Sequence, residues 1–371
     1  MSLANASTLT AASRQWASRP DDERFVNLFD LHDHTTSQRQ RSRGKVVSSR
    51  GVTAEPAGND HKGLVLRGPE GGVVTPSHFA FGQLANLAGA PAGYLRGLPS
   101  ELAADCINYG LKVERDVSDV GLLVRREDAG VVSLAAATGP NYGRIWNNDL
   151  TAALVNRFGN GLDGDFTIPG EFSKKVEITK ANTTLYAGDR DMFVFLADEQ
   201  NRITLPNRRD GRSGSLARGF FLWNSEVGNS TLGFAMFLFD YACSNRIVWG
   251  AQGYKEIRLR HTSAAPDRWL EEVQPVIEAY SHSAASPIEA QLQAAQQKRV
   301  DNVEEFLKAR KWTSTMIGRS LAAHEDEEGR PAETVWDLVT GATAYAKSIA
   351  HQDTRVGVER AAGKLLDLVA A

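Results

Sequence analysis

Two aromatic-rich apolar runs separated by a short polar stretch occupy residues 218–251, and they constrain the fold more than any other feature. The stretch reads RGFFLWNSEVGNSTLGFAMFLFDYACSNRIVWGA. Phe, Trp and Leu at this density favour the strands of a packed sheet, and residues 228–230 supply the Gly, Asn and Ser of a turn. We therefore expect a long antiparallel hairpin whose polar residues gather at the ends of its strands.

Further strands predicted on either side of this hairpin extend it into a sheet centred on residues 183–261. After Pro266 the pattern changes to helices. The sequence thus predicts an α+β protein with a long-stranded antiparallel sheet, flanking helices and an α-helical C-terminal region. We divide the chain into a flexible leader (1–24), an α+β body (25–265) and an α-helical C-terminal region (266–371).

Shorter patterns predict two hairpins and several helices around the sheet. Residues 63–76 and 120–138 each hold two apolar runs with turn residues between them. Residues 77–107 and 147–159 carry the apolar spacing of helices, and Asn148 is expected to cap the second of these regions.

The region after Pro266 is predicted to be helical. Pro275 indicates a kink, and Ser286 with Glu289 forms a capping pattern at the start of one long helix over residues 286–312. The apolar stripe of this helix is narrow, and Gln and Lys are plentiful. Such a helix usually packs in an assembly rather than in a core, which favours a homo-oligomer.

The composition bounds the class of protein and its compartment. The chain has 371 residues, of which 42 are Lys or Arg and 45 are Asp or Glu, and its net charge is −3. This balance does not indicate a protein that coats nucleic acid with its whole surface. Two cysteines are too few for a disulfide framework, and no signal peptide or apolar membrane span is evident. We expect a cytoplasmic protein that does not enter a membrane.

Basic residues are nevertheless concentrated in two polar stretches, residues 39–50 and 202–218. One interpretation is a pair of solvated loops. The other is two arms that neutralise phosphates, each contact adding a salt-dependent term to binding. The arginines of the second stretch that would contact phosphate are Arg208, Arg209, Arg212 and Arg218.

Three carboxylates are the candidates for metal chemistry. Asp189 and Asp191 are two residues apart, so on an extended strand both side chains point the same way. With Glu226 from a neighbouring strand they would hold Mg²⁺ through oxygen ligands. The alternatives are ion pairs of the two aspartates with Arg218 or Arg246 across the sheet, or a place in a polar binding groove. No other cofactor is expected, because no nucleotide-binding or hydrolase motif is present.

The polar residues at the hairpin ends admit two interpretations. Trp223, Asn224, Asn245 and Arg246 would form a hydrogen-bonded network that locks the hairpin, or they would hold a ligand with phosphate groups or base edges. In the second case Trp223 offers a face for base stacking. The residues alone slightly favour the first interpretation.

The same motifs carry a resemblance to a known family. LYAGDRDMFVFLADE, RGFFLWNSEVGNSTLG, FDYACSNRIVWGA and the C-terminal TVWDLVTGATAYA are similar to segments of the phage/plasmid-like protein family called domain of unknown function 932. The resemblance covers most of the chain. It implies a role in mobile genetic elements, and it carries no catalytic residues over to this sequence.

These observations lead to three functional hypotheses. The first is a mobile-element protein that binds nucleic acid without catalysis, in particular a homo-oligomeric single-strand DNA annealing or recombination protein. The second is an anti-defence protein that binds a host defence protein. The third is a metal-dependent nuclease or other hydrolase built on Asp189, Asp191 and Glu226, which arginine side chains in the same space would exclude.

Overall fold

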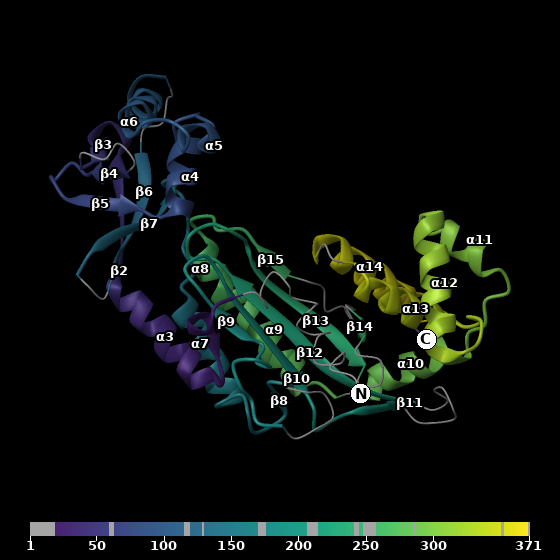
Figure 1. Ribbon diagram of the computed structural model, residues 1–371. Helices are drawn as coiled ribbons and strands as arrows, with labels where there is room; N and C mark the ends of the chain where they lie inside the picture. The colour runs from purple at the N-terminus through teal and green to yellow at the C-terminus, as the bar shows by residue number, and fades with distance from the viewer. Residues whose placement is uncertain are drawn as a thin grey trace.

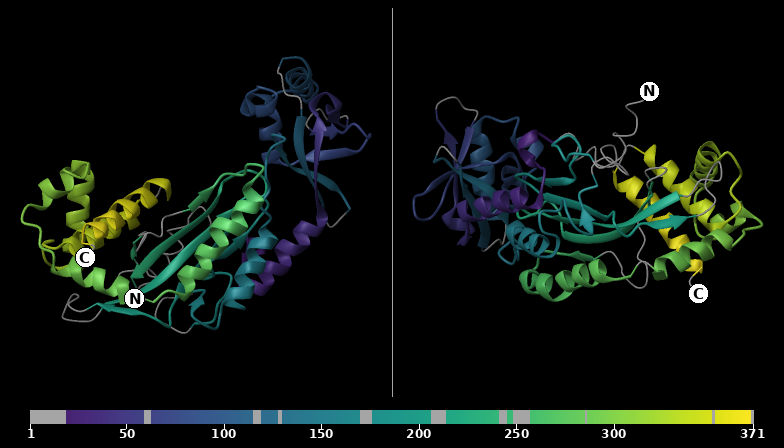
Figure 2. Two further views of the ribbon diagram at one scale, coloured as in Figure 1. Left: turned by 180° about the vertical axis from the view of Figure 1, so that it is seen from behind. Right: turned by 90° about the horizontal axis from the view of Figure 1, so that it is seen from below.

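The protein contains two β-sheets and a C-terminal group of helices, arranged along an elongated molecule (Figure 1). The six-stranded sheet lies at one end and the C-terminal helices at the other, with the larger sheet between them (Figure 2). The expected α+β class is therefore confirmed. The computed structural model describes residues 19–58, 63–114, 119–127, 130–169, 176–205, 214–240, 245–247, 257–284, 286–349 and 352–369.

The predicted hairpin is the centre of the larger sheet. Within the described residues this sheet has the strand order β1-β9-β10-β12-β13-β14, and every pairing is antiparallel. β11 also pairs with β12, β15 with β13, and β8 with β10. The strands are β1 (Arg24–Phe25), β8 (Phe166–Thr167), β9 (Leu185–Ala187), β10 (Met192–Asp198), β11 (Ile203–Leu205), β12 (Gly214–Asn224), β13 (Leu232–Asp240), β14 (Asn245–Ile247) and β15 (Ile257–Leu259).

Helices cover one face of the larger sheet. Successive strand residues point to opposite faces, so Phe220 and Leu222 face these helices and are fully buried in the main core. Leu154 on one helix and Ile277 on another pack against them. The covering helices are α3 (Leu28–Arg41), α7 (Asn147–Phe158), α8 (Ala265–Arg268) and α9 (Gln274–His282).

The opposite face of the larger sheet is aromatic. Phe221 on β12 stacks on Phe237 of β13 with ring centres 4.4 Å apart, and Phe195 of β10 meets the Phe237 ring edge-on at 4.8 Å. All three side chains are buried. The high Phe content of the hairpin therefore reflects a sheet that buries apolar residues on both faces, which is why its sequence shows little polar alternation.

A second, six-stranded sheet is built from residues 42–138, with strand order β2-β6-β7-β5-β4-β3. Both predicted hairpins, β4–β5 and β6–β7, belong to it, and three helices pack on it around a separate apolar core. The body between residues 25 and 265 thus holds two sheets. The elements are β2 (Ser42–Ser48), β3 (Thr53–Ala57), β4 (Gly63–Arg67), β5 (Val73–Pro76), β6 (Asp119–Arg126), β7 (Val132–Thr138), α4 (His78–Leu87), α5 (Ala92–Leu95) and α6 (Ser100–Tyr109).

The first basic stretch is regular structure, so its interpretation as a loop is wrong. Arg39 and Arg41 form the end of α3, and Arg43 and Lys45 continue directly into β2. Basic residues suit the last turn of a helix, where they complement its negative end. The stretch therefore holds its charges on a rigid frame at the point where the chain passes from one sheet to the other.

The C-terminal helices form a third core. The predicted single helix over residues 286–312 is wrong, because the chain breaks after Gln297 and Asn302 caps a new helix by accepting from the Glu305 N–H. The apolar stripe predicted for residues 286–312 packs in this core and is not free for assembly. Leu216 and Leu238 of the large sheet belong to the same core. The helices are α10 (Ser286–Gln297), α11 (Val303–Lys308), α12 (Ser314–Glu328), α13 (Val335–Lys347) and α14 (Gln352–Leu366).

The remaining helical segments in the described part of the chain are single turns. They are the 3₁₀ turns Asp21–Glu23, Ser49–Gly51 and Asp367–Val369 and the π turns Gly110–Glu114 and Trp269–Val273, the last of which lies at the kink expected near Pro275. Among the helices in the described ranges, none is both long enough and apolar enough to cross a membrane.

The α12–α13 contact buries a titratable side chain, His324. Its Nδ1 lies 3.3 Å from Oγ1 of Thr340, and its Nε2 lies 3.8 Å from the carboxylate of Asp337. Burial lowers the pKa of His324 from its ordinary value of 6.5; Asp337 raises it in part and Arg330 lowers it further. Gly341 permits this close contact, because a Cβ there would lie 2.5 Å from the main-chain oxygen of Ser320.

We predict that His324 makes the protein less stable in acid. Its folded-state pKa is below the unfolded value of 6.5, so the unfolded state binds the proton more readily. Stability from this group is complete above that pH and is lost as the pH falls through it. Thermal melts between about pH 7.5 and pH 5.5 measure the loss. His324→Asn should flatten the profile, whereas His282→Asn, an exposed control, should leave it unchanged.

Candidate functional site

The polar turn after β12 is where the two sheets meet. The Asn224 amide donates to Oδ1 of Asn147 at 2.8 Å, and the Gln83 side chain of α4 donates to the main-chain oxygen of Val227 at 2.7 Å. We call residues 224–227, with the groups that bind them, the junction. Asn224, one of the residues predicted to lock the hairpin, thus attaches the hairpin to α7, and Val227 attaches it to the helix α4 of the six-stranded sheet.

Glu226 is the charged centre of the junction. One carboxylate oxygen accepts from the main-chain N–H of Asn147 at 2.8 Å, and the other lies 3.4 Å from Nη2 of Arg125. Arg144 donates to the Glu226 main-chain oxygen at 2.7 Å. Burial raises the pKa of Glu226, while the Asn147 N–H and the charges of Arg125, Arg144 and Arg39 act in the opposite direction. These donors and charges compensate the burial of the carboxylate.

Arg125 occupies the space where the metal hypothesis places an ion. Its guanidinium lies 3.4 Å from Asp189 through Nη1, 3.4 Å from Glu226 through Nη2, and 3.2 Å from Oγ of Ser42 through Nε. The space between the two acidic side chains is therefore filled by a cation. This is the arrangement that excludes a metal site at these residues.

The third carboxylate, Asp191, points elsewhere. It forms an ion pair with Arg19 and accepts from the Asn229 amide at 3.3 Å. Asp189 and Asp191 lie in a turn closed by the Gly188 N–H, so the prediction that they share a strand face is wrong. Across the residues described, three or more acidic, His or Cys side chains nowhere form a metal-binding group.

Two further arginines of the junction stack on one indole. The Arg39 guanidinium lies 3.9 Å from the ring centre of Trp146, and that of Arg144 lies 5.6 Å from it. All three side chains are half-buried, and burial lowers the pKa of Arg144. Within the described ranges neither arginine has an ion pair with a carboxylate; Asp149 is the acid near Arg39. The region around the junction thus holds three arginines, Arg39, Arg125 and Arg144, and one buried acid, Glu226.

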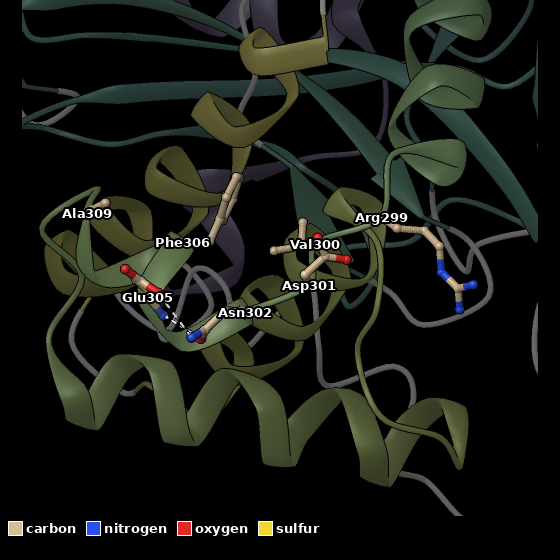
Figure 3. A pocket seen from close by; sticks show the side chains of 7 residues that line it. All are labelled: Arg299, Val300, Asp301, Asn302, Glu305, Phe306 and Ala309. Atoms are coloured by element: carbon tan, nitrogen blue, oxygen red, sulfur yellow. Dashed lines mark hydrogen bonds between the residues drawn. The ribbon is translucent and has the colours of Figure 1, made fainter.

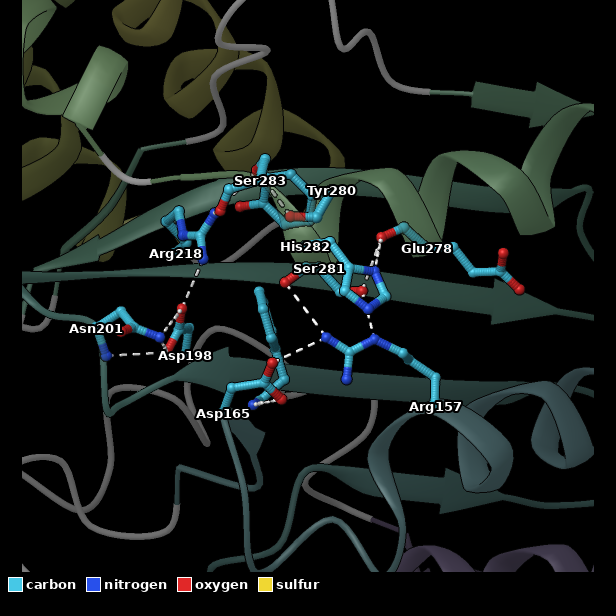
Figure 4. A network of polar contacts seen from close by, with 11 residues as sticks. Arg157, Asp165, Asp198, Asn201, Arg218, Glu278, Tyr280, Ser281, His282 and Ser283 are labelled. Atoms are coloured by element: carbon cyan, nitrogen blue, oxygen red, sulfur yellow. Dashed lines mark hydrogen bonds and ion pairs between the residues drawn. The ribbon is translucent and has the colours of Figure 1, made fainter.

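Arg218 does not lie on the surface, contrary to the sequence prediction. It is buried, its Nη2 bonds Asp198 at 2.7 Å, and its Nη1 donates to the main-chain oxygen of Ser283 at 2.6 Å (Figure 4). The neighbouring Arg157 binds Asp165 and Ser281 in the same network. Arg218 therefore ties α9 to the large sheet and is not available to phosphate.

Trp223 and Asn224 also contact other residues of the protein. The Trp223 indole covers Gly233 on β13 so closely that a Cβ there would lie 1.9 Å from the ring, and Arg258 lies 5.6 Å from the ring centre. Asn224 is fully buried. Asn224 is therefore not available to nucleic acid, whereas Trp223 is partly exposed and its contact with nucleic acid stays a prediction.

The remaining predicted binding residues are only partly placed. Arg208, Arg209 and Arg212 lie outside the described residues. Asn245 and Arg246 lie in β14, where their main chains pair with Asp240 and Phe239 of β13. Their proposed contacts with nucleic acid stay predictions.

Sequence reasoning missed Arg125, Arg144 and Trp146. None of these three residues belongs to a local sequence motif that marks it as functional. Arg39 gave a signal, since it belongs to the first basic stretch. The pairing of Arg125 with Glu226 joins positions 101 residues apart, which no local pattern reveals.

An open hollow of about 370 Å³ lies far from the junction, on α11 (Figure 3). Val300, Phe306 and Ala309 line its apolar side, and Asp301 and Glu305 lie at its polar side. Glu305 is occupied locally, because it accepts from the Asn302 amide at 3.1 Å. The hollow belongs to the break between α10 and α11 and brings no set of reactive groups together.

Comparison of the chain with protein-family models, with curated proteins and with solved structures gives no match in any of the three. The resemblance to the phage/plasmid-like family therefore stays a prediction, and function must be argued from the junction itself.

We predict that Glu226→Gln destabilises the protein. Gln keeps an acceptor for the Asn147 N–H but removes the charge that Arg125 faces. Breaking a buried ion pair typically lowers the free energy of unfolding by about 3 kcal/mol, which urea denaturation followed by circular dichroism measures. Glu272→Gln removes an exposed acid that pairs with Arg268 and should change little. Equal losses in the two variants would contradict the role given to Glu226.

We also predict that Gly233 is required beneath Trp223. Gly233→Ala places a methyl group inside the indole ring position and should destabilise the protein by about 1–3 kcal/mol or more, the range for overpacking. Gly44→Ala on β2 is the control, since no heavy atom lies within 4 Å of its added Cβ. Melting temperatures compare the two, and an unchanged Gly233→Ala melt would show that Trp223 lies elsewhere.

Proposed function

We propose that this protein binds nucleic acid, with the phosphate backbone lying against the arginines of the junction. The observation that supports this most is the stack of Arg39 and Arg144 on Trp146. Two half-buried cations held on one ring, without an ion pair to any described carboxylate, are favourably neutralised by an anion from outside.

The chemistry of these side chains suits phosphate. A guanidinium presents a planar fork of donors that matches phosphate oxygens, and stacking on an aromatic ring orients that fork before any ligand arrives. Arg190, exposed and 5.8 Å from the ring centre of Phe79, extends the basic surface beside the junction. The α7 N-terminus at Asn147 adds partial positive charge to the same region.

We propose single-stranded DNA as the preferred ligand and a cytoplasmic role in annealing or recombination on mobile genetic elements. The support is the resemblance of several motifs to the phage/plasmid-like family, together with an arginine- and aromatic-rich junction that suits a flexible strand. A homo-oligomer is part of this proposal.

Replacing both stacked arginines should weaken binding. We expect Arg39→Ala/Arg144→Ala to lose about tenfold or more in affinity at low salt, because charge-assisted hydrogen bonds are among the stronger ones. The slope of log affinity against log salt should flatten by about 1.4, since each phosphate contact to a single strand contributes about 0.7. Fluorescence anisotropy with labelled single-stranded and duplex DNA at about 50 and 200 mM salt measures both quantities.

Arg310→Ala is the matched control. Its guanidinium also stacks on an aromatic ring, 3.5 Å from the centre of Phe306, but it lies among the C-terminal helices. Affinity should not change in this variant. Equal weakening in the control and the double variant would show that binding does not occur at the junction. An absence of DNA binding by the unmodified protein would favour a protein partner, for which α6 exposes Leu102 and Tyr109.

A further inference from the structure

Asp189 is an exposed carboxylate that contacts one nitrogen of a buried arginine, Arg125. The side chain of Asp189 is 89% exposed, whereas that of Arg125 is 6% exposed. Nε and Nη2 of Arg125 point inward, to Ser42 and Glu226, and Nη1 points to Asp189 in the turn between β9 and β10. The Asp189 carboxylate is therefore the removable part of the arrangement.

The two acids that contact Arg125 differ in how firmly they are held. Glu226 is 3% exposed and is also fixed by the Asn147 N–H, so it stays as the permanent counter-ion. Asp189 makes a single long contact of 3.4 Å from an exposed turn. Because the Asp189 carboxylate stays largely in water, its contact with Arg125 is screened by solvent, and exchanging it for another anion costs little.

Arg125 is also electrostatically continuous with the stacked arginines. Arg125 and Arg144 meet at Glu226, where Arg125 lies 3.4 Å from the carboxylate and Arg144 donates to the main-chain oxygen at 2.7 Å. Burial lowers the pKa of Arg144, and the charges of Arg125 and Arg39 lower it further. Burial lowers the pKa of His34 on α3 from its ordinary value, the charges of Arg125 and Arg41 lower it further, and Asp189 raises it in part. An anion that reaches Arg144 thus comes near Arg125, whose Nη1 faces the Asp189 carboxylate.

We propose that Arg125 is a latent phosphate-binding residue, and that a backbone phosphate of nucleic acid replaces the Asp189 carboxylate at its Nη1. This inference rests on the proposed function and adds that an internal anion, the Asp189 carboxylate, competes with the phosphate for Arg125. Asp189 occupies the site in the free protein, so weakly bound anions do not gain access, while a polyanion already held by Arg39 and Arg144 displaces it. A guanidinium donates to carboxylate and to phosphate oxygens in the same geometry, so the exchange preserves its hydrogen bond.

Removing the competing charge tests this exchange. Asp189→Asn should bind single-stranded DNA about threefold to fivefold more tightly, the range that corresponds to a surface ion pair of up to about 1 kcal/mol. Asp33→Asn is the matched control, because it removes one exposed carboxylate from α3 and so reproduces the change in net charge. Its effect on affinity should be clearly smaller than that of Asp189→Asn.

A second pair of variants separates Arg125 from general electrostatics. In Arg125→Lys the ammonium keeps the charge beside Glu226 but cannot contact two partners through separate nitrogens. When Asp189→Asn is added to Arg125→Lys, the affinity for DNA should not rise further. If Asp189→Asn and Asp33→Asn change the affinity for DNA equally while the unmodified protein binds DNA, the latent site is overturned and the proposed function stands. If the unmodified protein does not bind, both are overturned.

Discussion

The carboxylate of Glu226 is buried where the large sheet, the start of α7 and the six-stranded sheet meet, and the arrangement of all three depends on it. Its partners come from different elements: Asn147 begins α7, Arg125 lies on β6 and Arg144 precedes α7. A charge taken out of water is tolerated only if donors compensate it. Glu226 therefore links the two sheets, together with the apolar contacts around Val227.

The same requirement accounts for the charge of the junction. One buried acid is surrounded by Arg39, Arg125 and Arg144, so compensation of Glu226 leaves positive charge over. Trp146 holds two of these side chains in fixed orientation at the surface. In the proposed function, the arginines that join the two sheets also form the surface that binds an anion, although the whole chain carries a net charge of −3. Local placement, rather than composition, decides what such a protein attracts.

The parts of the fold set by local pattern were predictable, and the parts set by distant contacts were not. The β12–β13 hairpin and the hairpins of the second sheet followed from apolar runs and turn residues. Asp189 and Asp191 were misplaced because LYAGDRDMF resembles one strand, whereas Gly188 begins a turn that ends it. The buried position of Arg218 was missed because an arginine in a basic stretch resembles an exposed one until its partners Asp198 and Ser283 are known.

The six-stranded sheet lies between α3 and α7 in the chain, yet these two helices pack together in space. Oγ1 of Thr35 and Oγ1 of Thr151 are 2.9 Å apart although 116 residues separate them. During synthesis the inserted sheet is complete, with its own core, before α7 exists, so it can fold first. When α3 and α7 then come into contact, the segment between them is a compact folded sheet rather than a long flexible chain. We therefore expect the order of folding to follow the connectivity, with the pairing of the distant strands of the large sheet, beside an already folded insert, as the slow, high-contact-order step.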